Sequence, residues 1–578
     1  MATTLQVSLG QHSLAKAGGA NQDFHGALLP LGYLRSSKGI AVALADGIGS
    51  SRVSQVASAA AVRGFLDDYY ATSEAWSVRR AAQRVLQATN SWLHAQNQRG
   101  DARFDKDSGY VCTFSALVLK GREMHLLHVG DARIYRVHPR ALEQLTEDHR
   151  VQVSSSESYL ARALGVGPYV EIDYRAWDAE VNDLYLLATD GAHTHLDAEA
   201  VHRALALHAG DLDAVAQQLS NDARARGSED DITVQLLRID ALPCADAPQA
   251  ALQREGLRMP PALAPRMAFE GYTVLRELHV SARSHVHLAV DDASGSQVVI
   301  KTPAVDRQAD ADFLDRFLLD EWVARRIDSP HVVRAHAPQR PRAHLFVAME
   351  YVEGQTLAQW MVDHPRPGMD PVRRIVLQVA KGLHAMHRRE MLHQDLRPAN
   401  VMVDAAGTAH IIDLGSTHVA GLVDCGREPQ AGAIAGTLQY TAPEYFLGQG
   451  GDERSDLFSL AVLCYQMLSG QLPYGLHVTQ VRTASDLRRL RYVPLRHHRP
   501  DLPAWLDAVL QRALQPQAER RQQAVSEFAH DLQSPGPSFH RHRAPPLVER
   551  NPVVFWQTLA ALLALVVCVL LGLLSRHG

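Results

Sequence analysis

The stretch with the clearest chemical content is residues 393–400, which reads HQDLRPAN. It places a carboxylate, Asp395, and an amide, Asn400, on what we expect to be a tight loop. A further carboxylate, Asp413, follows in the apolar run IIDLGS. Phosphoryl transfer from ATP needs a carboxylate that accepts a hydroxyl proton, and an amide and a carboxylate that can hold Mg²⁺. The three residues therefore predict ATP-dependent phosphoryl transfer. The alternative is a turn with chance polar residues.

A second set of acids lies in the N-terminal part of the chain, in NQD (21–23), ADGIGS (45–50), TDG (189–191) and EDDIT (229–233). Three of these motifs abut a predicted strand, and in two of them a glycine follows the acid and lets backbone approach a ligand closely. Carboxylates from separate strands that converge at a sheet edge can hold hard divalent cations through oxygen. Two such ions can activate a water toward phosphorus. The motifs predict metal-dependent phosphate hydrolysis, although any single Asp could be a turn residue or a helix cap.

The order and wording of these motifs resemble the metal-dependent protein phosphatases of type 2C. The likeness extends over nearly all of residues 1–240 and includes GDAR (130–133), LTEDH (145–149) and ARALG (161–165). It implies a β-sandwich flanked by helices that holds a pair of Mn²⁺ or Mg²⁺ ions. The implied ligands are Asp46, the carbonyl of Gly47, Asp190 and Asp230, with Asp23 nearby or acting through water and Asp131 helping to hold a third, weaker ion.

The chain departs from this family at the position whose side chain usually binds the substrate phosphate. Gly18 stands where most members have an arginine, and Lys16 is the nearest cation. A lysine cannot provide the bidentate fork of an arginine. Gln22 replaces a common glutamate, and Asp231 replaces an asparagine. We therefore expect hydrolysis with weak substrate binding.

The motifs HQDLRPAN and IIDLGS resemble the catalytic loop and the metal motif of protein kinases, HRDLKPxN and DFG. This resemblance spans residues 268–533 and implies a bilobal kinase fold. Thr437, in the GT pair of GTLQYTAPE, implies serine or threonine substrates. The implied roles are Asp395 as base, Lys301 on the ATP phosphates with Glu321 as its ion-pair partner, Arg397 near the γ-phosphate, Asn400 and Asp413 on Mg²⁺, Asp456 as a brace of the catalytic loop, and Arg520 as the partner of Glu444.

The kinase pattern fails in the loop that normally covers the ATP phosphates. His279, Ser281 and Ser284 stand where the family has three glycines, and side chains there can crowd the phosphates. This departure favours an alternative in which the domain is a pseudokinase that binds nucleotide or protein. The retained Asp395, Asn400 and Asp413 oppose that alternative.

The sequence also indicates how such a kinase is controlled. Gln394 replaces the arginine that pairs with a phosphorylated loop residue in activatable kinases, and residues 418–436 contain no Ser, Thr or Tyr. The arginine that would bind the phosphate and the hydroxyl group that would carry it are both missing, so we expect no activation of the kinase by loop phosphorylation. Substrates of the phosphatase part would then lie elsewhere.

Length and composition define the organisation of the chain. With 578 residues it is too long for one hydrophobic core. We predict a multidomain α+β protein. A net charge of −5 gives no reason to expect nucleic-acid binding, and five scattered cysteines indicate reduced thiols. The predicted parts are a phosphatase domain at 1–240, a proline-rich linker at 241–267, a kinase domain at 268–533, a basic proline-rich spacer at 534–552 and a transmembrane helix at 553–574.

The C-terminal run from Val553 to Leu574 holds 22 residues without a formal charge. As a helix it would span roughly 33 Å, enough for a bilayer core. Arg541, Arg543 and Arg550 precede it, and only Arg576 follows. This bias predicts a tail anchor in a bacterial inner membrane with both catalytic domains in the cytoplasm. The alternative is a buried helix of a soluble domain.

Together these patterns predict a membrane-tethered, bifunctional enzyme that phosphorylates and dephosphorylates proteins on serine or threonine. It would use ATP with Mg²⁺ in one domain and Mn²⁺ or Mg²⁺ in the other. The alternative is an active phosphatase with a regulatory pseudokinase domain.

Overall fold

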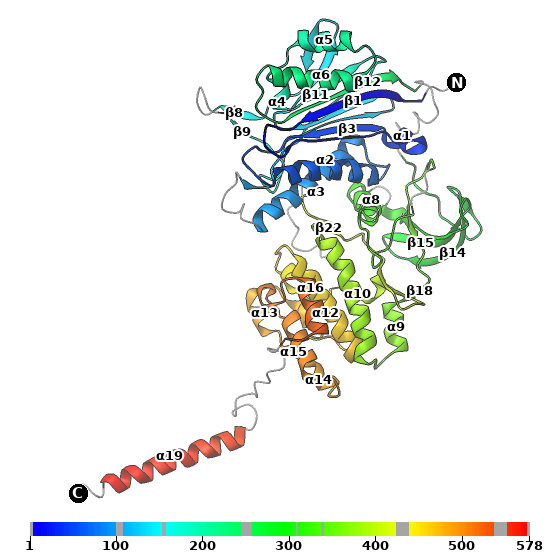
Figure 1. Cartoon of the computed structure of the whole chain (residues 1–578). Helices are drawn as coiled ribbons and strands as arrows, with labels where there is room; N and C mark the ends of the chain where they lie inside the picture. The colour runs from blue at the N-terminus through cyan, green and yellow to red at the C-terminus, as the bar shows by residue number, and fades with distance from the viewer. Residues whose placement is uncertain are drawn as a thin grey trace.

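The computed structural model describes residues 4–99, 108–152, 158–243, 257–307, 310–336, 340–422, 438–536 and 552–574. Figure 1 shows a layered β-structure at the N-terminal end, a two-part body below it and one long helix at the C-terminal end.

The N-terminal part contains two five-stranded sheets with the orders β1-β12-β11-β6-β7 and β10-β5-β4-β3-β2. An apolar core with Leu117 and Leu237 lies between them. β3 is buried along its whole length, as expected for an apolar strand covered on both faces. The strands are β1 (Gln6–Leu14), β2 (Phe24–Leu28), β3 (Ile40–Ala45), β4 (Phe114–Lys120), β5 (Glu123–Val129), β6 (Arg133–His138), β7 (Ala141–Gln144), β10 (Asp173–Asp178), β11 (Leu184–Ala188) and β12 (Ile232–Ala241), with the separate hairpin β8 (Arg150–Gln152) and β9 (Ser158–Leu160).

Helices cover the outer faces of both sheets. α2 (Ser54–Ala71) packs on β2 and β3 with α3 (Val78–Arg99) beside it, and α6 (Leu212–Ala225) packs on β1 and β12. α5 (Ala198–Leu207) packs against α6, and the short α1 (Gly32–Lys38) and α4 (Asp190–His193) complete this part. The helices and sheets are arranged as the sequence predicts, with a sandwich flanked by helices.

The second part has two lobes. The first is the sheet β13-β14-β15-β16-β17 with helix α8 (Ala311–Arg326), and the second is mainly helical. The strands of the first lobe are β13 (Ala268–Phe269), β14 (Tyr272–Val280), β15 (Ser284–Asp291), β16 (Gln297–Pro303) and β17 (Val347–Glu350). The second lobe contains β18 (Gly354–Thr356), β19 (Met391–Leu392), β20 (Val401–Asp404), β21 (Ala409–Ile411), β22 (His418–Val419), α9 (Leu357–Asp363), α10 (Met369–His387), α11 (Pro443–Phe446), α12 (Glu453–Ser469), α13 (Ala484–Arg489), α14 (Leu495–His498), α15 (Ala504–Ala513) and α16 (Val525–Gln533).

The two parts are joined by a continuous apolar cluster. Buried residues of α2, of α3 and of the turn between them, where Trp76 lies, belong to the same cluster as buried residues of α8, among them Trp322. In Figure 1 the α2 and α3 ribbons form the side of the sandwich that is turned toward the two-lobed body. No sequence pattern predicted this contact.

The predicted C-terminal helix is present as α19 (Pro552–Leu574). Among the helices built from described residues, none is long and apolar enough to cross a membrane. The predicted transmembrane span is therefore not confirmed.

Candidate active sites

The acidic motifs of the first part meet at one end of the sandwich. Asp46 directly follows β3, and Asp23 directly precedes β2, with Phe24 paired to Ala45. On the other sheet Asp190 follows β11, and Asp230 precedes β12, which is paired to β11. Strand pairing therefore brings each pair of acids to a common edge.

Asp23 is the most deeply held of these acids. Its Oδ2 accepts hydrogen bonds from Thr233 Oγ1 (2.7 Å) and Thr189 Oγ1 (2.9 Å). Its Oδ1 is buried and has no hydrogen-bond partner within the described part of the chain. Burial raises the pKa of Asp23 to about 7. A buried carboxylate oxygen without a donor is costly, and a cation would relieve that cost.

The pKa values of the neighbouring acids are raised as well. Burial, together with the negative charges of Asp23 and Asp190, raises the pKa of Asp46 well above its ordinary value. Burial and Asp230 raise the pKa of Asp190. Burial and Asp190 raise the pKa of Asp131 to about 6. Crowded carboxylates that resist ionisation are a set of hard oxygen donors suited to Mg²⁺ or Mn²⁺.

These acids do not form a closed metal cage. Where residues are described, no group of three or more His, Cys, Asp or Glu side chains is gathered tightly enough to be a preformed metal centre. The positive charge among them comes from Arg150, whose Nη1 lies 2.6 Å from Asp131 Oδ2 and 3.9 Å from Asp190 Oδ2. The donor set and the orphaned Asp23 oxygen fit the predicted ions. Bound cations would compete with Arg150 for Asp131 and Asp190.

Two glycines in the acidic motifs are required by packing. A Cβ at Gly47 would lie 2.8 Å from Ser54 Cβ, and a Cβ at Gly191 would lie 2.1 Å from the carbonyl oxygen of Asp231. Larger residues would push apart the loops that carry Asp46 and Asp190. The role of the Gly47 carbonyl as a ligand stays a prediction.

Asp231 has a clear structural role that the sequence did not indicate. Its buried carboxylate accepts the backbone N–H groups of Lys16 (2.7 Å) and Gln22 (2.9 Å). Lys16 Nζ in turn donates to Gln22 Oε1 at 2.8 Å. Asp231 therefore fixes the loop that leads to Asp23. The ammonium group of Lys16, which belongs to this loop, is directed at Gln22.

In the second part, Asp456 stabilises the catalytic-loop motif, as predicted. Its carboxylate accepts the backbone N–H groups of His393 (2.8 Å) and Gln394 (3.0 Å), and it contacts His387 Nε2 at 2.9 Å. Gln394 has a φ of 64°, which is uncommon for a residue other than glycine. The bonds to Asp456 stabilise this strained backbone and fix the direction of the next residue, Asp395.

Asp395, Arg397 and Asn400 lie together on this loop. Asn400 Nδ2 donates to the carbonyl oxygen of Asp395 (2.8 Å) and to its Oδ2 (3.1 Å). Arg397 Nε lies 3.7 Å from the same Oδ2. The amide therefore orients the carboxylate, with a cation beside it.

Lys301, on β16, contacts two further acids. Its Nζ donates to Asp320 Oδ2 at 2.7 Å and to Asp413 Oδ1 at 3.1 Å. The positive charge of Lys301 lowers the pKa of Asp413 to about 2. Burial alone would lower the pKa of Lys301, but Asp320 and Asp413 raise it above its usual value. Lys301 and Asp413 thus hold each other in the charged form.

The prediction that Glu321 is the partner of Lys301 is wrong, because Asp320 makes that ion pair. Successive residues of an α-helix point about 100° apart, so only one of the two can face β16. Glu321 points elsewhere and accepts a hydrogen bond from Arg342 Nη2 at 3.1 Å. Asp320 Oδ1 also accepts the backbone N–H of Leu414 at 3.0 Å. One side chain thus connects α8 to both Lys301 and the DLG motif.

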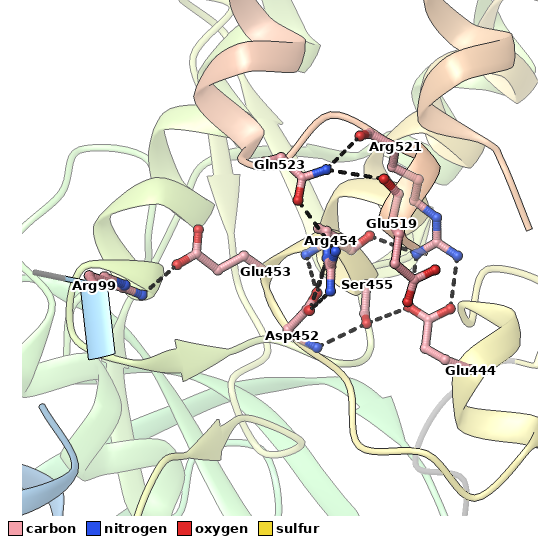
Figure 2. Close-up of polar contacts among 9 residues, drawn as sticks. All are labelled: Arg99, Glu444, Asp452, Glu453, Arg454, Ser455, Glu519, Arg521 and Gln523. Atoms are coloured by element: carbon pink, nitrogen blue, oxygen red, sulfur yellow. Dashed lines mark hydrogen bonds and ion pairs between the residues drawn. The ribbon is translucent and has the colours of Figure 1, made fainter. Parts of the chain in front are cut away.

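The predicted partner of Glu444 is also off by one position. Figure 2 shows the bidentate pair of Glu444 with Arg521, in which both N–O distances are 2.8 Å. Ser455 Oγ donates to the same carboxylate at 2.6 Å. Arg521 is buried, whereas Arg520 is exposed.

The hairpin that replaces the glycine-rich loop is closed by a side chain. β14 and β15 are joined at Val280 and His285. Ser281 Oγ accepts the backbone N–H groups of Arg283 (3.2 Å) and Ser284 (3.0 Å). A serine hydroxyl therefore defines a tight turn where kinases have flexible glycines.

Two predictions concern residues outside the described part of the chain. These are the role of Thr437 and most of the segment at 418–436, of which residues 423–436 are not described.

Comparison with known proteins finds a family for each part. The model described as "Protein phosphatase 2C" matches residues 11–227, and the model described as "Protein kinase domain" matches residues 272–532. Serine/threonine-protein kinase PknB of Mycobacterium leprae is 30% identical over 254 residues, which cover 43% of this chain and 40% of that protein. PknA of Corynebacterium glutamicum is 34% identical over 196 residues, covering 33% of this chain and 41% of that protein.

The chain thus spans about two fifths of the length of these curated relatives (40% and 41%). A crystal structure of the Mycobacterium tuberculosis PknI kinase domain is 30% identical and covers 48% of this chain and 100% of that chain, with a TM-score of 0.38.

Proposed function

The chain carries a protein phosphatase 2C domain and a protein kinase domain, and we propose that both are active on serine and threonine residues of proteins. The observations that carry the kinase half are the pairing of Lys301 with Asp320 and Asp413 and the hydrogen bond from Asn400 to Asp395. The observation that carries the phosphatase half is the set of carboxylates with raised pKa values around Asp46. The domain limits proposed here remain 1–240 and 268–533.

In the kinase half, Asp395 receives the proton of the substrate hydroxyl, and Asn400 keeps its carboxylate in position. Lys301 binds the α- and β-phosphates of ATP, and Asp320 orients its ammonium group. Arg397 lies beside Asp395, where it offsets the charge of the γ-phosphate. Mg²⁺ held by Asn400 and Asp413 would neutralise charge on the phosphates.

In the phosphatase half, the proposed ligands are Asp46, the Gly47 carbonyl, Asp190 and Asp230, with Asp23 and Asp131 in supporting places. Mn²⁺ or Mg²⁺ held there would lower the pKa of an attacking water and polarise the phosphate. Asp23 lies behind Asp46 and adds negative charge that favours cations. Arg150 supplies a cation at the mouth of the cluster for the anionic substrate, a role the sequence did not predict.

We also propose that the chain is tethered to a membrane, in a bacterium the inner membrane, through residues 553–574. The support is the uncharged sequence of this run and the arginines before it. The test is fractionation of cells that make the full chain or a chain ending at residue 552. Recovery of both forms in the soluble fraction would refute the tether.

The alternative is a pseudokinase domain that regulates an active phosphatase. The Ser281 turn in place of the glycine loop favours it. The deciding experiment measures transfer of labelled phosphate from ATP·Mg²⁺ to a generic protein by the full chain with Asp46→Asn, which silences the phosphatase. The added change Asp395→Asn must abolish the signal. If no transfer occurs while ATP still raises the melting temperature, the pseudokinase alternative is correct.

A further inference from the structure

The phosphatase domain contacts the kinase domain through one layer, defined here as the brace: α2, α3 and the residues 72–77 between them. We propose that the brace holds α8 in the position where Asp320 pairs with Lys301, so that phosphoryl transfer by the kinase depends on the docked phosphatase domain. This inference rests on the proposed kinase activity. It adds a second role for the phosphatase fold, one that needs none of its metal ligands.

The centre of the contact is aromatic and buried. Trp322 of α8 is fully buried, and its ring lies 5.9 Å from that of Trp76 in an edge-to-face arrangement. The guanidinium of Arg84 lies 4.3 Å from the centre of the Trp76 ring. Buried aromatic pairs of this kind contribute strongly to interfaces. The contact is thus packed like a protein core.

A buried ion pair crosses the same contact. Arg326 of α8 places Nε 2.7 Å from Asp68 Oδ2 of α2, and their side chains are only 5% and 7% exposed. Separation would leave both charges buried without their partner or would require the whole interface to open. At the edge, Asp315 of α8 pairs with Arg84 (3.5 Å) and Arg80 of α3. Helix α8 is therefore fixed to the brace near both of its ends.

The residue next to Asp320 is linked to the brace as well. Arg342 Nη2 donates to Glu321 Oε2 (3.1 Å) and to Ser73 Oγ (3.1 Å). Arg342 Nε also lies 3.7 Å from Glu74 Oε2. Glu321, which was predicted to be the partner of Lys301, is thus part of the contact between domains. It lies one position away from Asp320, which makes the ion pair with Lys301.

The brace also reaches the second lobe and the segment after the DLG motif. A Cβ at Gly421 would lie 2.2 Å from Ser91 Oγ of α3, so α3 packs directly on this segment. At the end of α3, Arg99 pairs with Glu390 (3.0 Å) and with Glu453 (3.1 Å), the latter shown in Figure 2. One helix of the phosphatase domain therefore contacts both lobes of the kinase.

These contacts supply what loop phosphorylation supplies in other kinases. Asp320 holds both Lys301 and the backbone of Leu414, so a displacement of α8 breaks both contacts together. Residues 418–436 offer no hydroxyl for phosphorylation, and Gln394 cannot bind a phosphate as an arginine would. A kinase still needs its lysine partner and its DLG aspartate in place. The brace is the structural element that meets this need.

The test uses the full chain with Asp46→Asn throughout and adds Arg80→Glu with Arg84→Glu. Arg80 is about half exposed (48%) and Arg84 is partly exposed (18%), so the chain should fold, which an unchanged circular dichroism spectrum would verify. We expect transfer to fall roughly tenfold. We also expect faster amide hydrogen exchange in α8 and in residues 414–422. Adding Asp315→Arg should restore much of the phosphoryl transfer and much of the protection from hydrogen exchange. The matched control is Arg203→Glu on the exposed face of α5, which should change neither.

The two measurements separate the possible failures. Unchanged transfer in the double variant overturns the inference, whether or not exchange in α8 becomes faster. A loss of transfer that Asp315→Arg does not restore, with exchange in α8 unchanged, overturns it as well. If the parent chain itself transfers no phosphate, the proposed kinase activity fails, and the exchange data alone then decide whether the brace holds α8.

Discussion

Lys301 and Asp320 are joined by an ion pair of 2.7 Å, and Asp320 is the residue through which α8 reaches the catalytic cluster. The pair is almost inaccessible on the Asp320 side, where the side chain is 2% exposed. Burial raises the pKa of Asp320 even though Lys301 opposes this, so the carboxylate depends on its partner to stay charged. The charge state of Asp320, its pairing with Lys301 and the position of α8 are therefore coupled.

The first prediction separates the two adjacent acids of α8. Asp320→Asn removes the charge that orients Lys301 and should lower kcat/KM for phosphoryl transfer by about 100-fold. Glu321→Gln keeps the catalytic pair and should lower it less than about tenfold. The measurement is transfer from ATP to a generic protein in the Asp46→Asn chain. A larger loss in Glu321→Gln than in Asp320→Asn would mean that the ion pair has been assigned to the wrong residue.

The second prediction concerns the ion pair of Glu444, whose partner is Arg521 and not the predicted Arg520. Arg521→Ala leaves Glu444 buried without its bidentate partner and should lower the free energy of unfolding by about 3–5 kcal/mol. Arg520→Ala, on the exposed neighbour, should change it by less than about 0.5 kcal/mol. Thermal or denaturant unfolding of the two variants side by side makes the comparison. Equal stabilities would contradict the assignment.

These two displacements show where sequence reasoning reaches its limit. Strand and helix positions such as β12 and α3 follow from the period of apolar residues, which tolerates an error of one residue. The assignment of an ion pair does not, since a shift of one position turns the side chain to another face of the helix. Asp320 and Arg521 were missed for this reason.

Other features could not be predicted because they depend on three-dimensional packing alone. The structural role of Asp231 is one of them, because its two backbone partners lie more than 200 positions away in sequence (215 and 209). The contact of Trp76 with Trp322 leaves no periodic signal, because Trp76 lies in the turn between α2 and α3 and Trp322 reads simply as a core residue of α8. The acidic motifs of both domains could be recognised from the sequence because each motif lies within a few consecutive residues.

The third prediction is a pH dependence of metal binding. The ordinary pKa of Asp23 is 3.8 and its folded value is about 7. A carboxyl group whose folded pKa is raised contributes stability that is complete below its unfolded pKa and is lost as the pH rises through the folded value. The metal-free phosphatase domain should therefore lose stability from about pH 4 to about pH 7. Over the same window bound Mn²⁺ replaces protons, so its affinity should rise with pH.

The measurement is the increase in melting temperature on adding Mn²⁺ at the two ends of this window. A larger increase at the acidic end would contradict the assignment of these carboxylates as metal ligands. The full chain with Asp46→Asn is the control, and its response to Mn²⁺ should be strongly reduced at both ends.

The last prediction uses two adjacent aspartates with different assigned roles. Asp231→Ala removes the acceptor for two backbone N–H groups and should lower the free energy of unfolding of the metal-free protein by about 1–3 kcal/mol. Asp230→Asn should leave that stability almost unchanged and should weaken the response to Mn²⁺, because its proposed role is to bind metal. Calorimetry with and without Mn²⁺ measures both effects in each variant. If Asp231→Ala abolished the Mn²⁺ response at no cost in metal-free stability, the roles of the two residues would have to be exchanged, and the loop from Lys16 to Gln22 would need another explanation for its fixed conformation.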